Sequence, residues 1–479
     1  MKRMKPMKRL MVALLAALGG CAVGPDYVRP DNALPLSYLP AGEALADTFD
    51  RHGSTLPAQW WTLFRSAPLD ALISASLQHN PSVEAAQAAL RLAQENVAAQ
   101  QGAALPMVDL GFTPTRQKIA GTLASPAASA ASIYSLHTAQ VTVSYTPDLF
   151  GSNRRQVESL QAQASQQRFL LDATYLALTA NVANAAIQEA ALRGQLAATR
   201  EIIASQTRVT AMVLRQVQLG QLGRADAAAQ EALLAVAEAS LPPLEKQLAL
   251  QRTLLTMLAG RFASDVVVEQ FDLASLQLPE RLPLTLPSTL VEHRPDVRAA
   301  EEQLHAASAA VGVAIANRLP NITLGVNAYG SSANRLSDLF KAGTGFWSLA
   351  GNITQPLFDA GMLQHRQAAA QAAYEQAAAQ YRSSVLNAFQ NVADALQAIR
   401  YDDVAERAAD RAEQATARSL AILRNQLALG DVSALSILIS EQAYQQAKLT
   451  QVQARANRLA DVVALCQALG GGWSPGTPH

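Results

Sequence analysis

Two long stretches without proline constrain this 479-residue chain more than any other feature. No proline follows Pro147 until Pro242, and none follows Pro356 until Pro475. Both stretches are rich in Ala, Leu, Gln, Glu and Arg, which favour helix. The predicted helices run from 148 to about 219 and from 357 to about 429. At 1.5 Å per residue each would extend for roughly 105–110 Å, and its polar side chains require water and packing partners rather than lipid.

The two helices belong to a repeat whose copies are offset by roughly 210 residues. Four landmarks recur in the same order: His79–Val83 and His293–Val297, Leu105-Pro106 and Leu319-Pro320, Asp148–Gly151 and Pro356–Asp359, and Val213–Arg215 with Gly220 against Ile422–Arg424 with Gly430. Each copy reads helix, strand, strand, long helix, turn, helix. Asn80 suits the N-cap of the first helix, and Pro81 suits its first turn. Two copies indicate a duplicated domain rather than a solenoid.

Four segments alternate between apolar and polar residues, which predicts strands. The predicted strands are at about 107–117, 133–146, 320–330 and 345–355. A sheet on a soluble core would alternate in the same way, but the length and the small polar face match a membrane β-barrel. Four strands cannot close such a barrel, and an open edge in lipid leaves backbone groups unpaired. If the strands lie in a membrane the chain must oligomerise, and strand counting leaves eight strands from two chains or twelve from three.

The first 20 residues predict an export signal that is not part of the fold. Five basic residues precede a nine-residue apolar stretch, Leu10–Leu18, which is too short to span a bilayer. Leu18-Gly19-Gly20-Cys21 resembles the bacterial lipobox, in which the cysteine is acylated and becomes the mature N-terminus. An ordinary signal peptide with a nearby cysteine is the alternative. Acyl chains on Cys21 would anchor the chain at a membrane surface without spanning it.

Composition argues against several classes of protein. The net charge is zero, whereas nucleic-acid binders carry a basic stripe. The two cysteines exclude a disulfide scaffold, and the seven histidines show no metal-ligand spacing. No histidine is paired with a nucleophile and carboxylate pattern, so we predict no enzyme, no metal and no cofactor beyond the lipid on Cys21.

Three motifs carry a resemblance to a known family. His293-Arg294-Pro295-Asp296-Val297-Arg298-Ala299-Ala300-Glu301 resembles a signature of the TolC-like outer-membrane factors. Cys21–Pro30, and Trp60–Phe64 followed by Pro68-Leu69-Asp70, are similar to the NodT/OprM-type lipoprotein branch of that family. The resemblance implies a mainly α fold with a membrane β-barrel. Three copies would form a twelve-strand barrel, with four strands per chain, and a long periplasmic α-helical barrel.

The resemblance also implies a function. The chain would be the outer-membrane channel of a tripartite efflux system in a Gram-negative bacterium, lipid-anchored and extending into the periplasm. As a homotrimer it would give drugs or small metabolites an exit and contribute to multidrug resistance. Its partners would be a periplasmic adaptor protein, an inner-membrane transporter of the RND or a related type, and outer-membrane lipid, but no nucleic acid. Two alternatives stay open: the duct of a type I protein secretion system, and a non-conducting coiled-coil spacer lipoprotein.

The expected domain boundaries follow from the repeat and the resemblance. The signal occupies 1–20, a lipidated and equatorial segment 21–68, the first repeat 69–260, an equatorial linker 261–286, the second repeat 287–469 and a C-terminal tail 470–479.

The periplasmic helix tips are the predicted gate and adaptor-docking site. Glycines suit the turns between the helices. Family members often carry carboxylates just after each tip, ringed around the pore, and Asp226 is at the matching place in the first hairpin. In the second hairpin the matching positions hold Ser436 and Ile439, with Leu435 nearby, so an apolar ring could gate by dewetting. Packing of Ile439 against a neighbouring helix is the alternative. The predicted tip residues are Gly220, Gly223, Arg224, Asp226, Gly430, Asp431, Leu435, Ser436 and Ile439.

Overall fold

The structure is a computed structural model that describes residues 22–30, 37–38, 49–50, 56–118, 133–265, 269–278, 281–284, 294–429, 432 and 434–471. The signal segment, Cys21, His293, Gly430 and Asp431 lie outside these residues. The chain forms two compact units. One comprises the residues up to Pro30 with Leu90–Gln167 and Ala300–Tyr381, and the other comprises Asp31–Ala89, Arg168–Ala299 and Arg382–His479. Each unit draws on both sequence repeats, so the repeats are not separate compact bodies.

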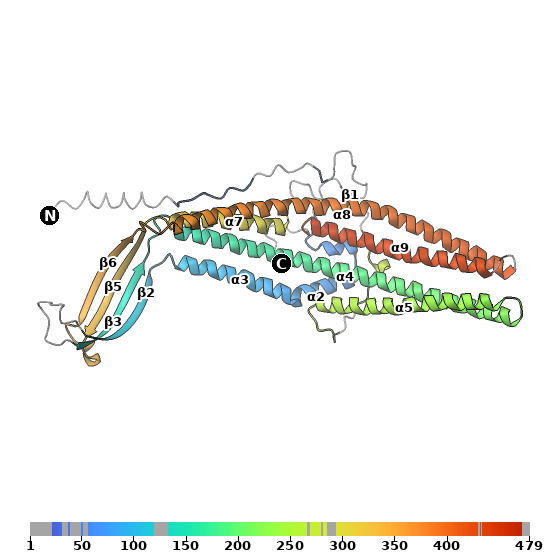
Figure 1. Ribbon diagram of the computed structural model, residues 1–479, viewed down its shortest axis with the longest axis horizontal. Coiled ribbons are helices and arrows are strands. Elements are labelled where there is room, and N and C mark those ends of the chain that lie inside the picture. The colour runs from blue at the N-terminus through green and yellow to red at the C-terminus, as the bar shows by residue number, and fades with distance from the viewer. Residues whose placement is uncertain are drawn as a thin grey trace. The chain divides into compact units, whose positions relative to one another are not determined.

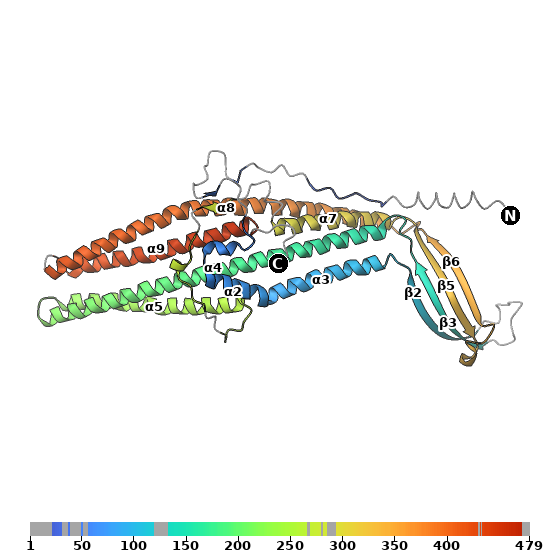
Figure 2. The ribbon, with the colours of Figure 1, turned by 180° about the vertical axis from the view of Figure 1, so that it is seen from behind.

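The predicted order of elements is confirmed in both repeats. The first repeat contains α3 (Pro81–Gly102), β2 (Met107–Lys118), β3 (Ile133–Tyr145), α4 (Ser152–Gln218) and α5 (Arg224–Leu258). The second contains α7 (Pro295–Ala316), β5 (Asn321–Ala333), β6 (Gly345–Thr354), α8 (Met362–Leu429) and α9 (Ala434–Ala468). Figure 1 shows these elements from one side and Figure 2 from behind.

The two long helices are unbroken over 67 residues in α4 and 68 in α8. Each begins a few residues later than predicted, because an aspartate before it accepts hydrogen bonds from the first backbone N–H groups. Asp148 accepts from Asn153 and Arg154 at 3.1 and 2.8 Å, and Asp359 accepts from Gly361 and Leu363 at 2.9 and 2.8 Å. These two carboxylates therefore set the start of the helices.

The first unit contains a four-stranded antiparallel sheet in the order β2-β3-β5-β6. Leu110 lies opposite Val141, Val143 opposite Val326, and Leu324 opposite Gly351. The hairpins of the two repeats are joined where β3 pairs with β5. Strands β2 and β6 form the two edges, as Figure 1 shows.

The two faces of the sheet differ in chemistry. On one face, the side chains of Thr142, Asn327 and Ser348 form a hydrogen-bonded row across three strands, with distances of 3.0 and 2.7 Å. The alternating residues on the edge strands are large, apolar and exposed, among them Leu110 on β2 and Leu349 on β6. The alternation that predicted the strands therefore separates a polar face from an apolar one.

Residues 22–30 are fixed against α4 and α7 in the first unit. The guanidinium of Arg155, which is buried, donates to the backbone oxygens of Val23 and Gly24 at 3.3 and 3.4 Å and to Asp26 at 2.6 Å. The Tyr27 ring stacks on His305 with the centroids 4.4 Å apart. The segment after the predicted lipidation site is thus an ordered part of this unit.

The aromatic motif at Trp60 begins the core of the second unit. Helix η1 (Trp60–Phe64) is followed by α2 (Ala67–His79), and the side chains of Trp60, Phe64 and Ile73 are fully buried. The Trp61 indole donates to Asp70 at 2.8 Å, which ties the two elements of the motif together.

The signature around Arg294 fixes the start of α7 to the end of α9. Arg294 donates to both carboxylate oxygens of Asp296, at 3.0 and 2.6 Å, and to the backbone oxygen of Ala468 at 2.9 Å. The signature therefore has a structural role: it holds the two ends of the second repeat together.

The linker after α5 is held by a buried acid of α4. Glu189, which has no exposed surface, accepts a hydrogen bond from the backbone N–H of Phe271 at 2.9 Å. Burial raises the pKa of Glu189 above its ordinary value. Farther along the linker, β4 (Leu282–Pro283) pairs in parallel with β1 (Phe49–Asp50).

Candidate functional site

The turn of the first helical hairpin is a Schellman motif. The N–H of Gln221 donates to the carbonyl of Gln216 at 2.9 Å, and that of Gly220 donates to Val217 at 3.0 Å. Gly220 has a φ of 74°, which a residue with a side chain adopts only with strain. Glycine at this position therefore ends α4 sharply and leaves an exposed turn.

Asp226 caps the helix that follows this turn. Its carboxylate accepts a hydrogen bond from the backbone N–H of Gly223 at 3.0 Å, and its own N–H donates to the carbonyl of Gly223 at 3.1 Å. Both Asp226 and Arg224 are exposed. Sequence reasoning assigned Asp226 to a pore-lining carboxylate ring, and the structure adds a capping role that the sequence analysis did not assign.

Fewer residues of the second hairpin turn are described than of the first. Gly430, Asp431 and the side chain of Leu435 lie outside the described residues, and Ser436 is half-buried. Ile439 is 63% exposed, whereas its neighbours Ile437 and Ser440 are buried. Within this chain Ile439 therefore does not pack against a neighbouring helix, and its role in an apolar ring stays a prediction.

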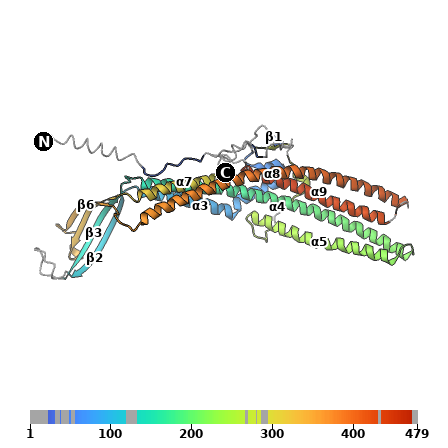
Figure 3. The same cartoon turned by 45° about the horizontal axis from the view of Figure 1, so that its top comes forward.

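An apolar cluster joins the ends of the two hairpins. Val209 and Val213 of α4 pack with Ala227 of α5, and Leu438 of α9 packs against them. Figure 3 shows the two hairpins from a third direction. This contact brings the predicted tip residues of the two repeats into one region of the second unit.

A polar cluster lies farther along the same helices. Glu441 of α9 is only 2% exposed and accepts hydrogen bonds from the Ser205 hydroxyl of α4 and from the Arg424 guanidinium of α8, the latter at 2.8 Å. Its second carboxylate oxygen is buried and has no hydrogen-bond partner among the described residues. A buried carboxylate that loses its cationic partner is strongly destabilised. The ion pair of Arg424 and Glu441 therefore joins the two helices of the second hairpin, and the Ser205 hydrogen bond couples this pair to the first hairpin.

A pair of buried amides fixes the two helices of the first hairpin near this cluster. The Gln230 side chain of α5 donates to the Gln206 side chain of α4 at 2.6 Å. Both are almost fully buried. Because their hydrogen bond is sheltered from water, sliding one helix past the other would leave polar atoms unpaired.

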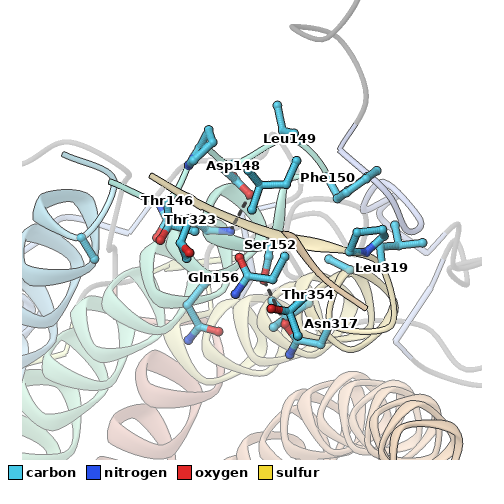
Figure 4. A pocket seen from close by; sticks show the side chains of 18 of the residues that line it. Thr146, Asp148, Leu149, Phe150, Ser152, Gln156, Asn317, Leu319, Thr323 and Thr354 are labelled. Atoms are coloured by element: carbon cyan, nitrogen blue, oxygen red, sulfur yellow. Dashed lines mark hydrogen bonds between the residues drawn. The ribbon is translucent and has the colours of Figure 1, made fainter. Parts of the chain in front are cut away.

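A cavity lies in the first unit where the strands meet the helices. Its volume is about 820 Å³, and it is lined by polar side chains of both repeats together with apolar residues of the two strand–helix turns. Ser152 and Asn317 meet there through a hydrogen bond of 3.2 Å (Figure 4). Asp148 also lines this cavity, where its carboxylate caps α4.

Two kinds of feature are absent from the described residues. No group of three or more His, Cys, Asp or Glu side chains in this part of the chain could hold a metal ion. Every helix in the described ranges lacks the length or the apolar character that crossing a membrane would require.

The family of this chain is shown by a match to a known protein family over both repeats. Residues 72–261 and 286–471 match the family described as outer membrane efflux protein. The chain belongs to the outer membrane efflux protein family. The resemblance predicted from the three motifs is thereby confirmed.

Individual relatives agree with this assignment. The pyoverdine export outer membrane protein OpmQ of Pseudomonas putida is 30% identical over 88% of this chain and 90% of its own length. The toluene efflux pump outer membrane protein TtgF of Pseudomonas putida is 30% identical over 97% of this chain and 96% of its own length. The solved outer-membrane channel OprN has a TM-score of 0.86 and 26% identity, covering 95% of this chain and all of its own.

This efflux protein is therefore an outer-membrane channel of an efflux system that extends into the periplasm. The predicted mainly helical fold with a four-stranded contribution per chain is confirmed. The structure brings the described tip residues of both hairpins into one region. Sequence reasoning missed Ser205, Glu441 and Gln230, and used Arg424 only as a repeat landmark. Their signal was weak, because single polar residues in long helices are usually exposed.

Proposed function

We propose that three copies of this efflux protein form one continuous exit duct. The observation that carries this proposal is the four-stranded sheet, whose edge strands β2 and β6 have no further partner among the described residues. An unpaired strand edge in lipid costs several kcal/mol per backbone group. A neighbouring copy can supply the missing partner at each edge, and three copies give the twelve strands that the resemblance implies.

The duct is closed at the helix tips by Arg424 and Glu441. Because the buried Glu441 accepts a hydrogen bond from Ser205 of α4, the second hairpin cannot move away from the first without breaking this bond and leaving the Glu441–Arg424 ion pair without its Ser205 partner. Opening requires this movement. Leu435 and Ile439 add an apolar constriction that excludes ions by dewetting.

The exposed turns are the docking surface for a periplasmic adaptor. Gly220, Gly223, Arg224 and Asp226 are exposed on the first turn, and Ser436 lies near the second. An adaptor that binds the turns can pull the hairpins apart. An inner-membrane transporter of the RND or a related type supplies the energy, because the duct itself has no chemistry to do so.

The exported substrates are drugs or small metabolites. Pyoverdine and toluene appear in the names of two relatives, and these names do not point to a single chemical class of substrate. A wide aqueous duct needs no specific binding site, so selection of the substrate belongs to the transporter. We assign the chain no enzymatic activity and no cofactor other than the acyl chains on Cys21, which anchor it to the outer membrane.

A permeability assay tests the gated duct. Arg424→Ala removes the cation beside Glu441, so cells that express it should take up a large hydrophilic antibiotic that the outer membrane normally excludes. We expect their susceptibility to rise several-fold. Arg418→Ala is the matched control, because Arg418 is an exposed arginine of the same helix. Equal susceptibility of the two variants, with equal amounts of protein in the outer membrane, would contradict the proposed gate.

A further inference from the structure

The turns that lead from strand to long helix are equivalent in the two repeats but are covered differently. Asp148–Gly151 follows β3, and Pro356–Asp359 follows β6. Leu149 and Phe150 in the first turn are half-buried, whereas Leu357 and Phe358 in the second are 94% and 90% exposed. Exposing two large apolar side chains to water costs about 1.5–3 kcal/mol each, so a cover for the second turn would be favourable.

The first turn is covered by the N-terminal segment. The N–H of Val23 donates to the carbonyl of Phe150 at 3.1 Å. A side chain on Gly151 would lie 2.6 Å from the Cα of Ala22, so the two backbones are in direct contact. Ala22 follows Cys21 directly. If Cys21 is acylated, its acyl chains enter the bilayer next to this turn.

Both turns lie at the same end of the sheet. Leu149, Phe150 and Pro356 line the same cavity, where the strands meet the helices. Because Ala22 is held at the first turn, acyl chains on the preceding Cys21 would mark the level of the membrane surface for both turns.

The exposed apolar residues of β6 lead to the second turn. Trp347, Leu349 and Ile353 are 77%, 71% and 69% exposed and lie on one face of the strand. Leu357 and Phe358 follow Thr354, the last residue of this strand, by three and four positions. Membrane barrels carry aromatic residues at the level where their lipid-facing strands reach the headgroups.

Basic side chains flank the same surface. Arg318 lies just before β5 and Arg366 lies in the second turn of α8, and both side chains are exposed. The Asp359 carboxylate caps this helix and interacts with Arg318. Lipid phosphates would add a further anionic partner for the arginines, while the arginine stems lie along the apolar boundary.

We propose that Leu357 and Phe358 insert into the phospholipid leaflet on the periplasmic side of the outer membrane, where they form an interfacial anchor beside the acylated N-terminus. This proposal rests on the proposed function, because it requires the four strands to be in the membrane. According to this proposal, lipid covers the exposed turn, rather than a second copy of the chain.

Spin labels on the reconstituted oligomer test this assignment. Phe358→Cys carries the label in vesicles of phosphatidylethanolamine and phosphatidylglycerol. The native Cys466 is 2% exposed, and burial raises the pKa of its thiol to about 12, so it contributes little labelling. Wild-type protein treated in the same way gives the background. Leu349→Cys on β6 is the control for lipid, and Leu219→Cys in the exposed hairpin turn is the control for water.

We expect the label at 358 to collide far more often with oxygen than with a water-soluble nickel chelate, as at 349 and unlike 219. A label at 358 that behaves like the one at 219 would overturn the proposal. So would an immobile label shielded from both reagents, which would indicate a neighbouring copy. Leu357→Cys repeats the measurement if Phe358→Cys does not assemble. Failure of the label at 349 to reach lipid would instead contradict the proposed barrel.

Discussion

Two carboxylates in the helical hairpins, the buried Glu441 and the half-buried Asp461, have different neighbours. Glu441 has an arginine partner, whereas Asp461 of α9 is close to another acid, Asp402 of α8. Burial and then the neighbouring carboxylate raise the pKa of Asp461 from 3.8 to about 7. Asp461 also lines a cavity with polar side chains of α4 and α5, so its protonation affects the contact between helices of both hairpins.

The raised pKa of Asp461 predicts a pH-dependent stability. Because the pKa of Asp461 is higher in the folded state, the folded protein binds this proton more tightly than the unfolded chain does. The stabilisation that the bound proton gives is complete below about pH 4 and is lost as the pH rises to about 7. Allowing for solvent screening, the free energy of unfolding should fall by roughly 1–2 kcal/mol over this range. Thermal unfolding at several pH values measures it. In Asp461→Asn this part of the pH dependence should disappear, and an unchanged pH profile would contradict the assignment.

A second residue-scale prediction concerns Gly24. Its φ is 101°, and a side chain there would lie 2.5 Å from the Cα of Gly312. Gly24→Val should therefore release residues 22–30 from α4 and α7, and limited proteolysis should cut this segment several times faster. Gly343→Ala is the control, because Gly343 also has a positive φ but has nothing near its Cβ position. Equal rates in both variants would show that the close approach does not hold the segment.

At the scale of elements, most of the fold could be predicted from the sequence. Long helices are recognisable because proline is absent, and the strands because one face is apolar and the other polar. The end of β5 was missed: it runs to Ala333, although the alternation fades after Gly330. Ser331 holds this end in place through hydrogen bonds to Leu339 and Thr344 of the following loop. Periodicity cannot reveal such contacts.

The site could be predicted less completely than the fold. The position of the first hairpin turn could be predicted from its glycines, because its Schellman motif requires a positive φ at Gly220. The partners of Glu441 come from α4 and α8, so their meeting depends on the packing of hairpins that are distant in sequence. Spacing along one helix carries no such information.

The junction of α2, α3 and α5 gives a prediction at this scale. Asn80 accepts a hydrogen bond from the N–H of Ser82 at 2.9 Å and donates to the backbone oxygen of Leu258 at 2.8 Å. Asn80→Ala removes the helix cap and leaves a buried carbonyl unpaired, so the free energy of unfolding should fall by about 1–3 kcal/mol. Chemical denaturation checks this. Asn317→Ala is a suitable control, because its hydrogen bond is exposed, and an equal loss in both would contradict the role of Asn80.

At the scale of the whole molecule, the two repeats divide their tasks between the compact units. Each repeat supplies two strands to the sheet and one hairpin to the helical unit. Duplication therefore builds both the sheet and the pair of packed hairpins that we propose as the gate. The proposed assembly of three copies closes the sheet at one level and the hairpins at another.

The most direct test of a gated export duct is single-channel recording of the lipidated oligomer in planar bilayers. We predict that the wild-type protein opens rarely and with small current, because the polar cluster around Glu441 holds the hairpins together and Leu435 and Ile439 exclude water. The double variant Leu435→Ala, Ile439→Ala should open often and with large current. A wild-type protein that conducts freely would contradict the gate. A correctly assembled oligomer that conducts in neither form would contradict the duct itself and favour a spacer lipoprotein.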